Sequence, residues 1–143
     1  MSEKTLLDFQ TDWERLVDKA LSNYSSLSAD ERIWFSIQCL LGDVCNGGLI
    51  SHYYNSGADH NKETITDLKI LGYQDIADLL LQINKLFPNE EPSVDVVERN
   101  NVISSWEDNN PELDNLLERL DEYFFNKSEE LEKALINHIE QNF

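Results

Sequence analysis

The stretch DVCNGGLISHYYNSGAD, residues 43–59, decides how this chain is arranged. It joins two apolar helical segments and contains three glycines, two tyrosines, a histidine and two asparagines. Asn46-Gly47-Gly48 predicts the end of a helix, because asparagine and glycine readily adopt the positive φ that terminates helices. We expect a short helix over residues 49–55, closed by Ser56-Gly57. The stretch is therefore interpreted as a structural hinge, with the Asn46 and Asn55 side chains capping helix ends.

The segment that precedes the hinge, residues 29–44, is apolar on nearly every side. Residues 28–31, Ser-Ala-Asp-Glu, form a capping box ahead of it, in which the Ser28 hydroxyl and the Glu31 carboxylate each accept a backbone N–H. A helix without a polar face is usually covered by other helices. We therefore predict that this helix is the centre of the fold.

Apolar residues recur at three- and four-residue spacing through most of the remaining chain, which predicts further helices. No segment alternates with period two, so the predicted fold class is all-α, as a single domain over residues 1–143. A surface loop is expected at Asn89–Pro92. The other expected helices cover residues 5–24, 62–71 and 76–87, a weaker one capped by Ser93, one from Pro111, and a last one after a break at 126–128.

The charge balance is the outlier of the composition. The chain has 143 residues, 41 % of them hydrophobic, with 28 carboxylates against 11 lysines and arginines and a net charge of −17. A nucleic-acid binder needs a basic surface, and anionic membranes repel an acidic protein. The charge therefore excludes both classes and favours a basic protein partner. Solubility alone is the simpler explanation of such acidity.

The two cysteines and the N-terminus favour a reduced, cytoplasmic protein. Cys39 and Cys45 are six residues apart, which on one helix places them on different sides, so no disulfide is expected. We interpret both as partly buried thiols. No run of 18 apolar residues predicts a membrane span, and the N-terminus lacks the pattern of a signal peptide.

Residues near the hinge are candidates for a metal-binding or catalytic site. His52, His60, Asp43 and Asp59 lack the spacing of metal ligands, so no metal or other cofactor is predicted. Cys45 and His52 could pair as a nucleophile and its base, but a cysteine at the end of an apolar helix is more often inert. No phosphate-binding motif occurs. We therefore predict no catalytic residues, and an enzyme with a pocket at 46–59 remains an alternative.

Carboxylates gather on the last two predicted helices. Too few lysines and arginines lie beside them to neutralise the charge, and like charges three or four residues apart repel one another slightly. A row of fixed carboxylates can imitate the phosphates of duplex DNA, which carries one charge per ~1.7 Å of its axis. The alternative is an ordinary solvated helix face. The candidate partner-binding residues are Asp114, Glu118, Asp121, Glu122, Glu129 and Glu132.

The hinge resembles the marker of a bacterial family of DNA-mimic proteins. In that pattern a helix ends in Asn-Gly-Gly, an aromatic-rich helix ends in Asn-Ser, and Glu-Thr opens the next helix. Here these are Asn46-Gly47-Gly48, Tyr53-Tyr54-Asn55-Ser56 and Glu63-Thr64. The resemblance covers roughly residues 27–140, with departures at Leu49, Ser51 and Ala58. It implies an all-helical fold and a DNA-binding protein as the partner, and it implies no catalytic residues.

The sequence therefore favours a non-enzymatic interaction module that occupies the DNA-binding face of a basic protein such as a transcription factor. An immunity or antitoxin-type inhibitor of a nuclease toxin is a second hypothesis, because its surface would look alike. The pocket enzyme is the third. Homodimerisation stays open.

Overall fold

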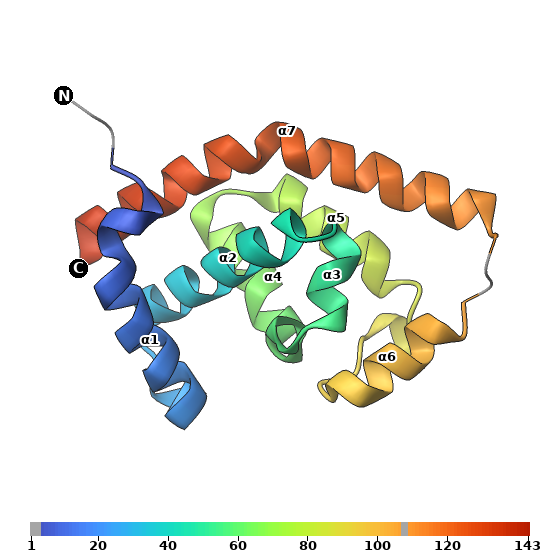
Figure 1. Cartoon of the computed structure of the whole chain (residues 1–143), viewed down its shortest axis with the longest axis horizontal. Coiled ribbons are helices and arrows are strands. Elements are labelled where there is room, and N and C mark those ends of the chain that lie inside the picture. Colours follow the sequence, from blue (N-terminus) through green and yellow to red (C-terminus); the bar gives the residue numbers. More distant parts are fainter. Residues whose placement is uncertain (1–3, 107–108) are drawn as a thin grey trace.

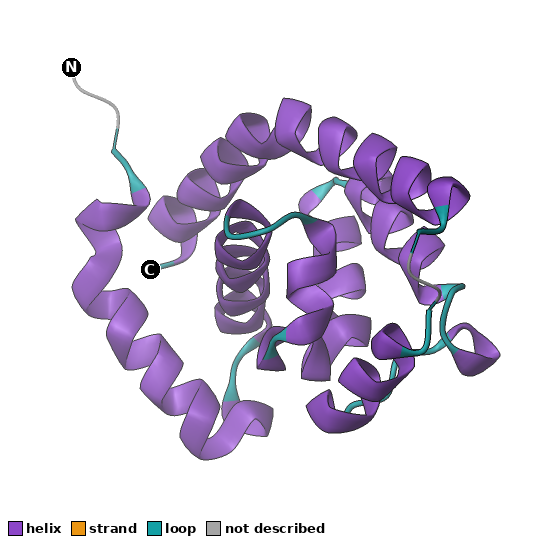
Figure 2. Ribbon diagram, turned by 45° about the vertical axis from the view of Figure 1, so that its right-hand side comes forward, coloured by secondary structure: helices purple, strands orange, loops and turns teal. Residues whose placement is uncertain are grey.

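The computed structural model describes residues 4–106 and 109–143, so the first three residues of the predicted domain lie outside it. Every regular element in the described residues is a helix, as predicted (Figure 2). The α-helices are α1 (Gln10–Asn23), α2 (Ala29–Cys45), α3 (Leu49–Tyr54), α4 (Asn61–Leu71), α5 (Gln74–Asn84), α6 (Val96–Ser104) and α7 (Pro111–Asn142). Four 3-10 turns accompany them: η1 (Leu6–Phe9), η2 (Tyr24–Ser26), η3 (Ser56–His60) and η4 (Pro88–Glu90).

Helix α2 lies at the centre, as the sequence predicted. It packs against α1, α3, α4 and α7 and buries Ile33, Trp34, Ile37, Leu40 and Val44. Its capping box forms: Glu31 N donates to Ser28 Oγ (3.1 Å), and Ser28 N donates to Glu31 Oε1 (2.9 Å). Figure 1 shows α7 running along one edge of the molecule, with α1 at its C-terminal end and α6 below its N-terminal end.

The predicted break at residues 126–128 is wrong. Helix α7 continues through it for 32 residues, about 48 Å at 1.5 Å per residue. Leu120, Phe124, Leu131, Leu135 and Ile139 are buried at helical spacing on both sides of the expected break, so packing holds the helix continuous. At the break itself, Ser128 Oγ donates to Phe125 O (2.9 Å), which suits a helical turn. Packing of the apolar stripe thus outweighs the low helix propensity of asparagine and serine.

Three smaller predictions are also corrected. Helix α6 is capped by Asp95, whose carboxylate accepts from Val97 N (2.8 Å), and not by Ser93, which instead donates to Glu98. Asn55 caps no helix through its side chain, because its Nδ2 donates to Asp43 Oδ1 (3.2 Å). Asn46 is the C-cap residue of α2 as expected, but it caps the helix through its backbone N–H and not through its side chain.

The two thiols differ in exposure. Both are free, and Cys39 is half-buried as expected, whereas Cys45 is exposed at the end of α2. The prediction of partial burial is therefore wrong for Cys45. Within the described residues, no helix is long and apolar enough to cross a membrane.

Candidate protein-interaction surface

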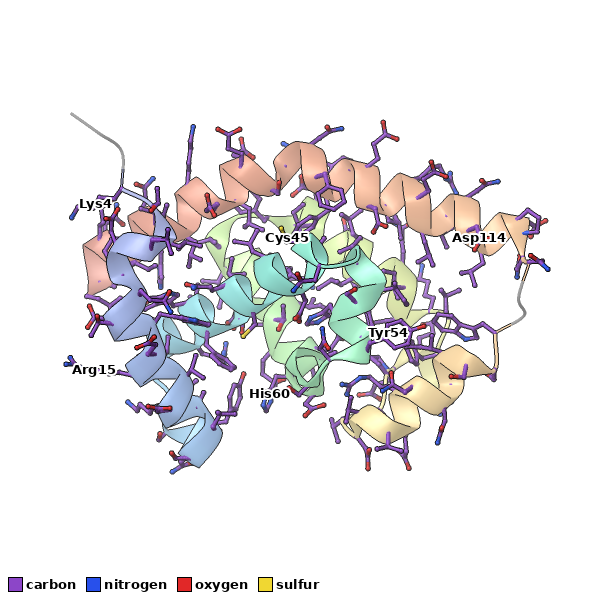
Figure 3. All side chains as sticks on the ribbon, viewed as in Figure 1. Lys4, Arg15, Cys45, Tyr54, His60 and Asp114 are labelled. Carbon is purple, nitrogen blue, oxygen red and sulfur yellow. The ribbon has the colours of Figure 1, made fainter. Side chains whose placement is uncertain are left out.

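The carboxylates of α7 lie on one long helix rather than on two. At about 100° per residue, five of the six candidates fall within an arc of about 80° around the helix. All five are exposed, and the first and last are about 27 Å apart along the axis. Figure 3 shows Asp114 near the N-terminal end of α7. We call this set the acidic strip: Asp114, Glu118, Glu122, Glu129 and Glu132.

The acidic strip is poorly neutralised by basic residues. Lys133 approaches Glu129 (3.5 Å), but both side chains are exposed, and such pairs contribute little. Among the described residues, the other four members of the strip form no ion pair within 4.0 Å. Lys127 faces away from the strip, toward Asp75 and Glu130. The strip is therefore a row of carboxylates with little compensating charge.

Asp121, the sixth candidate, has a different place. It is half-buried, and its Oδ1 accepts a hydrogen bond from Leu49 N (2.8 Å), at the first residue of α3. This contact joins residues 72 positions apart and puts a negative charge on the positive end of the short helix. Asp121 therefore docks α7 onto the hinge.

The hinge itself depends on Gly48. Its φ of +84° lies in the region that favours glycine, and a Cβ there would lie 2.5 Å from Asp121 Oδ2. Glycine thus permits both the turn between α2 and α3 and the close approach of α7. This agrees with the interpretation of the hinge as structural.

The residue that holds the other end of α3 was not predicted from the sequence. Arg99 is fully buried, although arginine is rarely so. Its guanidinium donates to three backbone carbonyls, of Tyr53 (3.0 Å), Asn55 (2.8 Å) and Ser93 (2.8 Å). It also lies 2.9 Å from Asp59 Oδ1. Helix α3 therefore has a carboxylate at its N-terminus and a guanidinium at its C-terminus.

A second buried pair, between α2 and α4, was also missed. Asp67 is fully buried and accepts hydrogen bonds from Arg32 Nε and Nη2, the shortest 2.7 Å, and from Ser36 Oγ (2.8 Å). Hydrogen bonding to Asp67 raises the pKa of Arg32 above its ordinary value. These contacts fix the central helix to its neighbour and leave both charges satisfied.

The hinge also borders an open hollow of about 720 Å³. Its lining shows whether the residues expected of an enzyme pocket at 46–59 come together. Asn46 and Asn55 line it, together with Ser56 and Gly57. His52 does not, because it is 1 % exposed and its Nδ1 lies 3.3 Å from Asp43 Oδ2. The convergence of Asn46, His52 and Asn55 that a catalytic site would need is therefore not formed.

The two thiols beside the hollow do not supply a nucleophile–base pair either. Burial, and secondarily the charge of Asp43, raises the pKa of Cys39 to about 12, so this thiol stays protonated near neutral pH. Cys45 makes no hydrogen bond to His52 among the described residues. No group of three or more histidine, cysteine or acidic side chains in the described ranges is arranged to hold a metal ion.

Comparison with known protein families identifies the family of this chain. The model of the DMP19-like protein family matches residues 25–142, which is most of the chain and includes the hinge, Arg99 and all of the acidic strip. This chain belongs to the DMP19-like protein family. The family is one of DNA-mimic proteins, as the Asn-Gly-Gly and Asn-Ser marker indicated. No curated protein and no solved structure gives a match.

Membership in the DMP19-like family makes the acidic surface the first place to look for function. The match begins after α1, so η1 and α1 lie outside the residues that define the likeness. The acidic strip, Asp121 and the hinge all lie inside it.

Proposed function

We propose that this protein is a non-enzymatic interaction module whose acidic strip occupies the DNA-binding face of a basic DNA-binding protein. The observation that supports the proposal most is the row of exposed, little-compensated carboxylates along one side of a single long helix. Asp114, Glu118 and Glu122 follow one another every four residues, about 6 Å apart along the axis. One strand of B-DNA carries a charge about every 3.4 Å, so the strip reproduces part of that charge density.

The strip also carries a contact that duplex DNA does not offer. Phe125 lies within the same arc of α7 and is half exposed, although an aromatic ring gains by burial. Exposed aromatic residues are frequent anchors of protein–protein interfaces. The strip therefore combines long-range attraction from its carboxylates with an apolar contact at close range.

Capture from the native cell tests the proposal. The protein, immobilised through its N-terminus, is exposed to lysate at low salt and eluted by a salt gradient, and the eluted proteins are identified. We expect a DNA-binding protein that elutes steeply with salt, because screening weakens exposed charge interactions, and that duplex DNA releases. Capture of a nuclease would instead favour the immunity or antitoxin hypothesis.

A charge-matched pair of variants makes the test specific. The first replaces the five acids of the strip by Asn or Gln. The control neutralises five exposed acids elsewhere, Glu14, Asp18, Asp78, Glu90 and Glu91, and so has the same net charge. We expect the strip variant to lose most binding, on the order of tenfold or more, and the control to lose little. Equal loss in both variants would mean that binding depends on net charge and not on the strip. Full binding by the strip variant would refute the proposal.

A further inference from the structure

The hollow beside the hinge is contiguous with the acidic strip. Glu132, the last member of the strip, lines it from α7. Residues of α1, α2 and the hinge line the rest of it, among them Trp13, Gln38, Gly42, Asp43, Asn46, Asn55 and Gly57. Its volume of about 720 Å³ is in the range of sites that enclose small ligands or inserted side chains. A partner that lies along α7 would therefore pass over a concave site.

Among the described residues, the lining of the hollow carries negative charge and includes no lysine or arginine. Asp43 is held in place by Asn55 Nδ2 (3.2 Å) on one oxygen and by His52 Nδ1 (3.3 Å) on the other. Glu132 is exposed and forms no ion pair among the described residues. A fixed carboxylate and a free one thus face the same space, which favours a cationic occupant.

One wall of the hollow is an immobilised aromatic ring. Trp13 stacks on Phe35 (5.9 Å between centroids, 29° between planes) and packs against Trp34 (6.2 Å). A ring held in this way loses little freedom when a ligand covers it. Indole rings attract cations, and the planar guanidinium stacks on them better than an ammonium does. Trp13 comes from α1, outside the residues that match the family.

We propose that the hollow receives an arginine side chain of the protein partner. The guanidinium would stack on Trp13 and pair with Glu132, with Asp43 adding negative charge behind it. Its five N–H donors also suit the amide oxygen of Asn46 at the edge of the hollow, whereas that of Gln38 already accepts from Trp34 Nε1 (2.8 Å). The partner's identity rests on the proposed function, whereas the preference of the hollow for a guanidinium does not.

Gly42 offers a way to fill the hollow without disturbing the fold. It lines the hollow, and no heavy atom outside its own helix turn lies within 4 Å of where its Cβ would be. It lies within α2 and is not among the glycines of positive φ, so replacing it relieves the entropic cost of a helical glycine. Gly42→Trp should fill the hollow, and Gly42→Ala is the matched control that leaves it open.

The test is a titration with two short capped peptides, Ac-Gly-Arg-Gly-amide and its lysine counterpart, followed by NMR shifts of the Trp13 indole and of the backbone amides of Gly42 and Gly57. We expect saturable shifts with the arginine peptide, and binding several-fold weaker for the lysine peptide. Gly42→Trp should weaken arginine binding by about tenfold or more, Glu132→Gln by a few-fold and Gly42→Ala by less than about twofold.

The outcomes separate this inference from the proposed function. If the arginine peptide shifts no resonance of the hollow, or if Gly42→Trp leaves its binding unchanged, the inference is wrong even when a DNA-binding protein is captured through the strip. If the peptide binds as expected but no DNA-binding protein is captured, the guanidinium site stands and the proposed function fails. Equal binding of both peptides would reduce the hollow to a general cation site and would overturn the assignment to arginine.

Discussion

The charged side chains at the two ends of α3 are paired, whereas most of those in the acidic strip of α7 are not. At α3, Asp121 and Arg99 are each matched to the helix end of opposite polarity, and their hydrogen bonds are 2.8–3.0 Å long. In the acidic strip of α7, four of the five carboxylates have no cationic partner among the described residues. The first arrangement holds distant segments together. The second makes no such contact between distant segments, apart from the exposed pair of Glu129 with Lys133 on the same helix.

Of the substitutions proposed, replacement of Arg99 should lower the free energy of unfolding the most. Arg99→Met keeps much of the volume but leaves the carbonyls of Tyr53, Asn55 and Ser93 without their donor. We expect a loss of about 3–5 kcal/mol in the free energy of unfolding, measured by urea denaturation, because three carbonyls lose their donor and each buried polar group left unsatisfied costs about 1–3 kcal/mol.

Arg99→Lys is the control for charge alone, and it should recover only part of the stability because a single ammonium cannot reach three carbonyls in a planar arrangement. Asp59→Asn should cost far less, since the Asp59 side chain is 34 % exposed and water can replace the pair. A loss below about 1 kcal/mol in Arg99→Met would show that the C-terminal end of α3 is not held in this way.

A smaller effect separates two adjacent carboxylates of the same helix. Asp121→Ala removes the acceptor of Leu49 N and should cost about 1–2 kcal/mol in the free energy of unfolding, as loss of an N-terminal cap does. Glu122→Ala, one residue on but in the acidic strip, should change stability by less than about 0.5 kcal/mol. In the partner-binding assay the order should reverse, with Glu122→Ala the more harmful. Equal effects of the two variants in both assays would remove the distinction between the hinge and the strip.

What the sequence could predict follows from the range of the interactions involved. The Ser28–Glu31 capping box is local, so its residues are neighbours in the chain and the pattern identifies them. The centrality of α2 followed from its apolar faces. The continuity of α7 did not, because the propensities of residues 126–128 indicated a break, and only packing on both sides of it holds the helix together.

The candidate site shows the same limit. Exposed carboxylates on one helix face can be selected by spacing, and five of the six candidates do lie together on α7. Asp121 has the same spacing and charge as its neighbours, and only the fold brings it to Leu49, 72 residues away. Arg99 could not be singled out, because an arginine next to polar residues in a short helix is normally solvated. The hollow could not be predicted at all, since α1, α2, the hinge and α7 each contribute only a part of its lining.

The smallest effect concerns a carboxylate that has partners at the start of α2. Glu31 accepts from Ser28 N (2.9 Å) and lies 2.9 Å from Lys19 Nζ, and these contacts hold its pKa below the ordinary value, with the backbone hydrogen bond as the larger cause. A lowered pKa in the folded state means that the contribution of Glu31 is present above the pKa of an unfolded glutamate and is lost as the pH falls through the folded value.

Glu31→Gln should therefore be less stable than the parent protein by about 0.5 kcal/mol near neutral pH, with the difference closing as the pH falls below about 4. Glu132→Gln is the matched control from the acidic strip: it makes no such contacts, so its stability should stay close to that of the parent across the same range. Urea denaturation at several pH values measures both. A difference between Glu31→Gln and the parent that did not change with pH would mean that the charge of Glu31 is as unpartnered as the charges of the strip.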